Sequence, residues 1–163
     1  MDSLTDLSRT LGATLLQAKQ SVAVAESSAA GLVSAALLAV PGASAFYRGG
    51  VVCYTVYARQ ALLGITDAEM TGLRPSTEGY ALLLARRVRE RLGTDWGVGE
   101  TGATGPTGNR YGDAAGHACI AVVGPRGERA LTLETRQRGR EPNMWCFTRA
   151  TLELLEQLLT GAS

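Results

Sequence analysis

The apolar positions of this chain follow two periods, one typical of helices and one typical of strands. Leucines spaced three or four residues apart predict an amphipathic helix over residues 3–18: Leu4, Leu7, Leu11 and Leu15. The next segment, 21–25, is short and alternating, which favours a strand. By the same reasoning we expect helices over 32–40, 57–63, 77–92 and 144–159, and strands over 49–55, 96–99, 117–123 and 130–135.

The order of these elements predicts the fold class. Strands that alternate with helices favour a three-layer α/β/α sandwich around a largely parallel, mixed sheet. The turn at 125–127 predicts a hairpin, and therefore an antiparallel portion at the end of the sheet. Residues 101–116 hold five of the twenty glycines and are expected to form a loop. Since we find no linker or repeat, we expect a single domain over residues 1–163.

Composition and charge exclude several classes of partner. Apolar residues make up 45% of the chain and charged residues 19%, which is a globular composition. The 16 basic and 15 acidic side chains leave a net charge of +1, so bulk electrostatics favours neither nucleic acid nor an anionic membrane. No apolar run approaches the roughly 18 residues of a membrane span, and the acidic N-terminus does not resemble a secretory signal.

Histidine, lysine and cysteine limit the possible chemistry further. His117 and Lys19 are the only residues of their types in the sequence, which excludes a multi-histidine metal site. The three cysteines, Cys53, Cys119 and Cys146, have no metal-ligand spacing and lie in apolar segments. We therefore expect no metal and no cofactor, and buried free thiols in a reducing cytoplasm.

Polar segments follow three of the expected strands, at the end where open sheets bind ligands: 26–28, 54–55 and 101–106. A serine at a strand-to-helix turn lies beside unpaired N–H groups, which could hold an oxyanion or a phosphate. Ser27 or Ser28 could equally cap the helix that follows. The 101–108 loop is either a phosphate cradle or an ordinary connection, and it matches neither a Walker A loop nor a dinucleotide fingerprint.

The same segments resemble a known family. Residues 25–31, Ala-Glu-Ser-Ser-Ala-Ala-Gly, are similar to the A-E-S-C-T-G-G signature of the CinA C-terminal domain family. Four further segments resemble its V-P-G-S-S, G-G-x-V-x-Y-S, L-G-V and T-G-I-A-G-P motifs: 40–44, 49–55, 63–65 and 101–106. The motifs occur in the order and spacing of the family, from about residue 20 to about residue 123.

This family includes enzymes that deamidate nicotinamide mononucleotide to nicotinate mononucleotide and ammonia. The resemblance implies an α/β/α fold, a cytoplasmic location, a homodimer and a pyridine-nucleotide-like ligand. Carried over, the catalytic positions are the nucleophile Ser27, the second serine Ser44, the tyrosine Tyr54 and, at the base position, Arg59. The expected ligand-binding residues are Glu26, Ser28, Glu100, Thr101, Gly102, Thr104 and Gly105.

Arg59 departs from the family, which has a lysine at this position. A serine nucleophile needs a neighbouring group that accepts its proton, and arginine does not release its own. Arg59 could orient Ser27 or bind a carboxylate or phosphate instead. Lys19 precedes the first strand and would lie roughly 20 Å from Ser27, which follows it. We therefore expect weak or absent deamidase activity, with a non-catalytic nucleotide-binding or phosphorylated-ligand-binding protein as the alternative.

Glu100 offers another alternative, because the family usually has an apolar or small residue there. It could be a replacement base with a pKa raised by burial, which would make the chain an altered hydrolase. It could also form a static ion pair with Arg59, and we favour this ion pair. His117 begins a strand, so it points away from the site unless that strand is antiparallel. We expect one pocket to be surrounded by Ser27, Ser44, Tyr54, Arg59 and Thr101.

Overall fold

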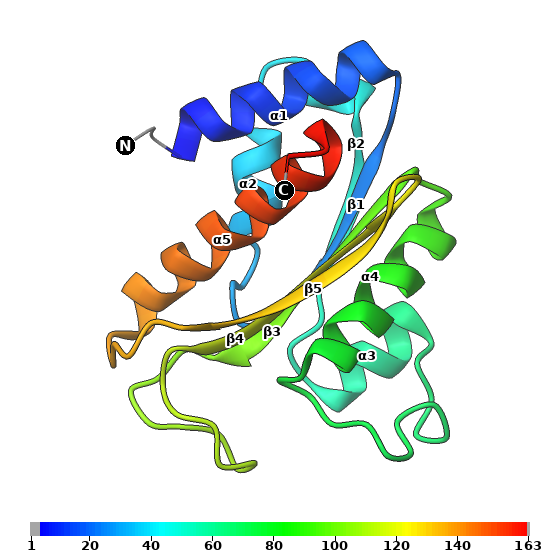
Figure 1. The fold of residues 1–163 in the computed structure, drawn as a ribbon. Coiled ribbons are helices and arrows are strands. Elements are labelled where there is room, and N and C mark those ends of the chain that lie inside the picture. Colours follow the sequence, from blue (N-terminus) through cyan, green and yellow to red (C-terminus); the bar gives the residue numbers. More distant parts are fainter. Residues whose placement is uncertain (1–3, 163) are drawn as a thin grey trace.

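A mixed sheet lies between two layers of helices in the computed structural model, which describes residues 4–162 (Figure 1). In the described chain its strands are β1 (Val22–Glu26), β2 (Tyr47–Val52), β3 (Trp96–Ala103), β4 (His117–Gly124) and β5 (Gly127–Glu134), in the order β2-β1-β3-β4-β5. β1 pairs in parallel with β2 and β3, whereas β4 is antiparallel to both β3 and β5. The predicted α/β/α class with a mixed sheet is confirmed.

The helices divide between the two faces of the sheet. They are α1 (Leu4–Ala18), α2 (Leu32–Leu38), α3 (Val56–Leu63), α4 (Glu78–Leu92) and α5 (Arg140–Thr160), with a short 3-10 helix η1 (Ala43–Ala45) before β2. α1, α2 and α5 cover one face, and α3 and α4 cover the other (Figure 1). No helix within residues 4–162 combines the length and the apolar character needed to cross a bilayer.

Alternate side chains of β1 pack into two different hydrophobic cores, one on each face of the sheet. Val22 and Val24 pack with α1, α2 and α5, whereas Ala23 and Ala25 pack beneath α3 and α4. Small residues let α4 approach the sheet closely: a Cβ at Gly99 would lie 2.1 Å from the Ala81 carbonyl oxygen of α4. The layers therefore hold the carboxyl ends of β1 and β3 in a rigid frame.

Several expected boundaries were wrong. The strand expected over 49–55 ends at Val52, and the strand expected over 130–135 begins at Gly127. β3 continues to Ala103, so Thr101 and Gly102 lie in a strand rather than in a loop. Their register with β4 explains this, because Thr101 pairs with Cys119 and the sheet ladder satisfies the backbone of an otherwise polar segment. α5 begins at Arg140, several residues before the expected start near residue 144.

Candidate functional site

A cavity of about 560 Å³ lies at the carboxyl ends of β1, β2 and β3. Because these strands are parallel, the segments that follow β1 and β2 and the last residues of β3 meet at one edge of the sheet. Five of the residues expected at a site line this cavity: Ser27, Tyr54, Arg59, Thr101 and Gly102. The remaining lining residues are Cys53, Thr55, Val56, Tyr57, Pro75, Ser76, Tyr80, Asn109, Arg110 and Tyr111.

Ser44 does not share this cavity. It is an exposed residue of η1, which precedes β2, whereas Tyr54 follows β2. The six residues of β2 separate the two ends by roughly 20 Å at about 3.3 Å per residue. The expected five-residue pocket is therefore wrong at Ser44, which lies at the opposite edge of the sheet.

The turn after β1 is held from behind by Glu100. One carboxylate oxygen accepts the backbone N–H of Ser27 at 3.0 Å and that of Ala29 at 2.9 Å. The other accepts the hydroxyl of Ser28. Glu100 is fully buried and does not line the cavity. The expected ion pair between Glu100 and Arg59 is wrong, since Arg59 instead donates from Nη2 to Asp67 at 3.2 Å.

Both readings of the serines in this turn also need correction. α2 begins at Leu32, its N-cap residue is Gly31, and no side chain caps it, so neither Ser27 nor Ser28 is its capping residue. The N–H groups of the turn are not free for an external anion either, because Glu100 accepts two of them and Glu26 accepts the N–H of Ser34 at 3.2 Å. The side chains of Glu100 and Glu26 therefore accept the N–H groups that were expected to bind an oxyanion from a ligand.

Ala30 adopts the left-handed conformation that the turn requires. Its φ is +58°, and the following Gly31 has a φ of +97°. The resembling family has glycine at the position of Ala30, and a left-handed alanine costs roughly 1–2 kcal/mol. The turn therefore keeps its backbone shape although one glycine has been lost.

Glu26 and Glu100 form a pair of buried carboxyl groups beneath the turn. Burial raises the pKa of Glu26 to about 8, with a further contribution from the neighbouring charge of Glu100. Burial also raises the pKa of Glu100, against the hydrogen bonds from Ser28, Ala29 and Ser27 that lower it. A pKa of about 8 means that Glu26 is protonated at neutral pH, and its Oε1 has no hydrogen-bond partner.

This pair predicts a pH-dependent stability. The pKa of Glu26 is about 8 in the folded chain, against the ordinary value of 4.5 for an exposed glutamate of the unfolded chain, so the folded state binds the proton more tightly. The contribution of Glu26 to the free energy of unfolding is complete below about pH 4.5. It is lost as the pH rises to about 8, at up to about 1.4 kcal/mol per pH unit. Glu26→Gln mimics the protonated form and should lack this loss. Urea unfolding of both proteins from pH 5 to pH 9 checks it, and parallel stability curves would contradict it.

Arg59, Tyr80 and Cys53 form another part of the cavity lining. Arg59 comes from α3 and is 6% exposed, and its Nε is buried without a hydrogen-bond partner. Burial raises the pKa of Tyr80 to about 12 and that of Cys53 to about 11, although the charge of Arg59 acts against both shifts. At neutral pH the thiol is therefore protonated and a poor nucleophile.

Thr104 and Gly105 lie beside the cavity rather than in its lining. Asn143 of α5 donates to the Thr104 carbonyl oxygen at 2.8 Å. Arg140 donates to the Gly105 carbonyl oxygen at 2.8 Å and to the Tyr54 hydroxyl at 3.2 Å. The start of α5 thus ties this loop to the rim of the cavity, a role that no sequence motif indicated.

Ser76 is a cavity residue that sequence reasoning missed. It is buried with a φ of +60°, and its N–H donates to the Thr101 hydroxyl at 3.1 Å. Such a conformation is uncommon for a residue other than glycine and often occurs at functional sites. The segment 73–77 carries no recognisable motif, so only the structure reveals its place.

The loop 109–111 closes another side of the cavity and was also missed. Arg74 fixes it through a two-pronged ion pair with Asp113, at 2.7 and 3.0 Å. The guanidinium groups of Arg74 and Arg110 lie 5.3 and 5.1 Å from the centre of the Tyr111 ring. This arrangement adds an aromatic ring and a cation to the cavity wall.

His117 lies at the cavity edge of the sheet because β4 is antiparallel. Its Nε2 is 2.9 Å from the Ser76 carbonyl oxygen, and its Nδ1 bonds Glu134. Burial lowers the pKa of His117, but the hydrogen bonds with Glu134 and Ser76 outweigh burial and raise it. His117 does not line the cavity, so its contacts indicate a structural role.

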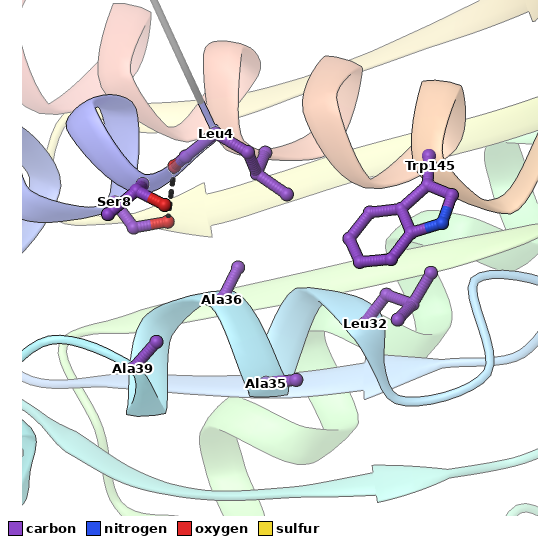
Figure 2. Close-up of a pocket in the computed structure, with 8 residues that line it drawn as sticks. Leu4, Ser8, Leu32, Ala35, Ala36, Ala39 and Trp145 are labelled. Carbon is purple, nitrogen blue, oxygen red and sulfur yellow. Dashed lines mark hydrogen bonds between the residues drawn. The ribbon is translucent and has the colours of Figure 1, made fainter.

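A second cavity, of about 210 Å³, lies on the other side of the sheet between α1, α2 and α5 (Figure 2). It is mostly apolar, and the hydroxyl of Ser8 in its wall donates to the Leu4 carbonyl oxygen at 2.9 Å. The half-exposed ring of Trp145 flanks it. Among residues 4–162, no titratable side chain lines this groove, so acid–base chemistry points to the Ser27 cavity.

The described residues contain no cluster that could bind a metal. Within residues 4–162, no group of three or more His, Cys, Asp or Glu side chains has such an arrangement. The donors around the Ser27 cavity are hydroxyls, amides and guanidinium groups, which suit an organic anion better than a cation.

Comparison with known proteins gives a consistent assignment. The family model for the CinA C-terminal domain matches residues 4–159. A CinA-like protein of Gloeobacter violaceus is 37% identical over 146 residues, covering 89% of this chain and 34% of the relative. One of Chlorobium limicola is 34% identical over 152 residues, covering 91% and 35%. The chain therefore spans about a third of the length of these curated relatives.

Solved structures agree with this comparison. The crystal structure of the competence/damage inducible protein CihA from Agrobacterium tumefaciens has a TM-score of 0.89 and 26% identity, covering 97% of this chain and 96% of that one. The competence damage-inducible protein A of Klebsiella pneumoniae has a TM-score of 0.92 and covers 99% and 100%. At 21% identity, the second likeness concerns the fold alone.

Proposed function

We propose, since the chain belongs to the family of CinA C-terminal domains, that it binds a pyridine nucleotide in the Ser27 cavity and has little or no deamidase activity. The cavity contains a serine, a tyrosine and a base position from the motifs that resemble nicotinamide mononucleotide deamidases. Its volume of about 560 Å³ lies within the range of small-molecule sites. Polar groups and aromatic rings both line it, as a nucleotide ligand requires.

The observation that carries this proposal is the buried guanidinium of Arg59 at the base position. Deamidation would need the Ser27 oxygen to attack the carboxamide carbon, ammonia to leave, and water to release the acid. A base must take the serine proton in the first step, and a buried lysine can do so because its pKa falls readily. Arginine keeps its proton under these conditions. The nucleophile is therefore present without an effective base.

The surroundings of Ser27 support low activity for a second reason. Acyl transfer needs N–H donors aimed at the developing oxyanion. Glu100 accepts the N–H groups of Ser27 and Ala29, which removes these two donors from that task. Glu100 does not reach the cavity, so the geometry gives no support to Glu100 as a replacement base. A ligand-binding role without turnover fits these contacts better than an altered hydrolase.

The test is an incubation of purified protein with nicotinamide mononucleotide, followed by measurement of ammonia and of binding. We expect binding by calorimetry and ammonia release near the rate without protein. Turnover at ordinary amidohydrolase rates would contradict the proposed inactivity. Absence of both binding and turnover would contradict the assignment of a pyridine nucleotide.

We further propose that the chain forms a homodimer in the cytoplasm, as the family resemblance implies. Val52, Val56 and Tyr57 support a dimer, because the edge strand β2 and the start of α3 expose these apolar side chains. A second copy would cover this rim. Light scattering should give twice the chain mass, and Tyr57→Glu should lower it. A monomer mass for the unmodified chain at micromolar concentration would refute the dimer.

A further inference from the structure

Arg59 carries an unsatisfied donor in the wall of the cavity. The side chain is more than nine-tenths buried, and Nη2 donates to Asp67 at 3.2 Å. Nε is buried and has no partner. Buried polar groups are nearly always hydrogen-bonded, and a charged donor without an acceptor is costly. The chain provides no acceptor for this atom, so an acceptor from a ligand would complete the site.

The lining of the cavity has a positive charge balance. In the part of the chain that the structure describes, Arg59 and Arg110 are its charged lining residues, and no carboxylate lines it. Asp67 is the ion-pair partner of Arg59, but its side chain is 79% exposed, and water screens such a pair strongly. Glu100 lies behind the turn, where the N–H groups of Ser27 and Ala29 stabilise its charge, and the neighbouring Glu26 is protonated at neutral pH. A negatively charged ligand group would therefore be favoured beside Arg59.

The geometry points to Arg59 as the residue that binds an oxyanion of the ligand, either a carboxylate or a phosphate, and makes the cavity select anionic over neutral ligands. This inference deepens the proposed function. It depends on that function only for the identity of the ligand, a pyridine nucleotide. A guanidinium pairs with both groups through directional N–H donors, and it is the preferred side chain for buried pairs. A lysine at this position would serve as a base, whereas an arginine serves as a receptor for charge.

A carboxylate at Arg59 would have a direct consequence for ligand choice. Ser27 lies in the same cavity, so the ring substituent that an amidohydrolase attacks would lie between Ser27 and Arg59. A neutral carboxamide offers Arg59 one uncharged oxygen, whereas a carboxylate offers two charged ones. The acid form of a pyridine nucleotide should then bind more tightly than its amide form, which is the reverse of the preference a deamidase needs.

Calorimetric titration tests the proposal with nicotinate mononucleotide, nicotinamide mononucleotide, ribose 5-phosphate and inorganic phosphate. If Arg59 binds a carboxylate, the acid should bind roughly tenfold to a hundredfold more tightly than the amide. If it binds the phosphate, both mononucleotides and ribose 5-phosphate should bind with similar affinity. In either case Arg59→Gln should weaken binding of the anionic group by roughly tenfold or more.

Arg9→Gln is the matched control, because it removes the same charge from an exposed position of α1 that does not line the cavity. It should change each affinity by less than about threefold. Arg59→Lys is the second variant if Arg59→Gln does not fold, and it should retain binding of inorganic phosphate but lose most of the discrimination between acid and amide.

The outcomes separate this inference from the proposed function. Binding of nucleotides that Arg59→Gln leaves unchanged would overturn the inference and leave the function standing. Binding of inorganic phosphate that needs Arg59, without binding of either mononucleotide, would support the inference and refute the function. No binding of any of the four compounds would refute both.

Discussion

Arg59→Lys is expected to raise the rate of nicotinamide mononucleotide deamidation by about a hundredfold over the unmodified chain. General-base help contributes about 10² to 10⁴ in rate, and lysine at this buried position can lose its proton whereas arginine cannot. The loss of the base is thus the largest single term in the proposed inactivity. Ammonia release under single-turnover and steady-state conditions measures the gain.

Asp67 decides how large this gain becomes. It lies 3.2 Å from Nη2 of Arg59 and would stabilise the charged form of a lysine at the same position. The double variant Arg59→Lys with Asp67→Asn should therefore be more active than Arg59→Lys at neutral pH, and its activity should begin at lower pH. Glu100 is not the partner to remove, because it contacts the turn rather than Arg59.

Two controls make this prediction decisive. Adding Ser27→Ala to Arg59→Lys should abolish the gain, because the proposed nucleophile is then absent. Asp67→Asn alone should show no gain, since the guanidinium still cannot act as a base. A gain that survives Ser27→Ala would show that lysine acts by another route. Even with both controls met, recovery should remain partial, because Glu100 occupies two N–H groups of the turn.

The periodic segments of the sequence predicted most of the fold. Leucine spacing predicted α1. α4 is capped by Thr77 at its N-terminus and ends at Gly93, which has a left-handed conformation. Polar residues at strand ends predicted the cavity, because the parallel pairing of β1 with β2 and β3 brings those ends together. The leucine spacing and the helix caps are local features, so neighbouring residues in the sequence are enough to predict them.

The parts that the sequence did not predict depend on register and on which edge of the sheet a segment occupies. Ser44 belongs to a segment that resembles a family motif. The order of the motifs does not reveal that Ser44 and Tyr54 lie at opposite ends of β2. Ala25 pairs with Gly99, so the next residue of β3, Glu100, lies beneath the turn that follows β1. No single segment reveals this register. Because of it, Glu100 accepts the N–H of Ser27 instead of forming the expected ion pair with Arg59.

Glu100→Ala is expected to lower the free energy of unfolding by about 3–5 kcal/mol. The substitution removes the acceptor of the Ser27 and Ala29 N–H groups and of the Ser28 hydroxyl, and leaves these donors in a buried space. Glu100→Gln keeps the volume and one acceptor oxygen, so its loss should be smaller, about 1–3 kcal/mol. Glu153→Ala, at a half-exposed position of α5, should change stability by less than about 0.5 kcal/mol.

The pH dependence tests separately whether the charge of Glu100 acts on Glu26. The charge of Glu100 helps to raise the pKa of Glu26, so Glu100→Ala and Glu100→Gln should both bring that pKa down from about 8. The protonated Glu26 stabilises the folded chain only up to the pH of its own pKa. Both variants should therefore lose this stabilisation over a lower and narrower pH range. Urea unfolding between pH 5 and pH 9 measures this shift. A destabilised Glu100→Ala protein with the pH profile of the unmodified chain would mean that the charge of Glu100 does not act on Glu26.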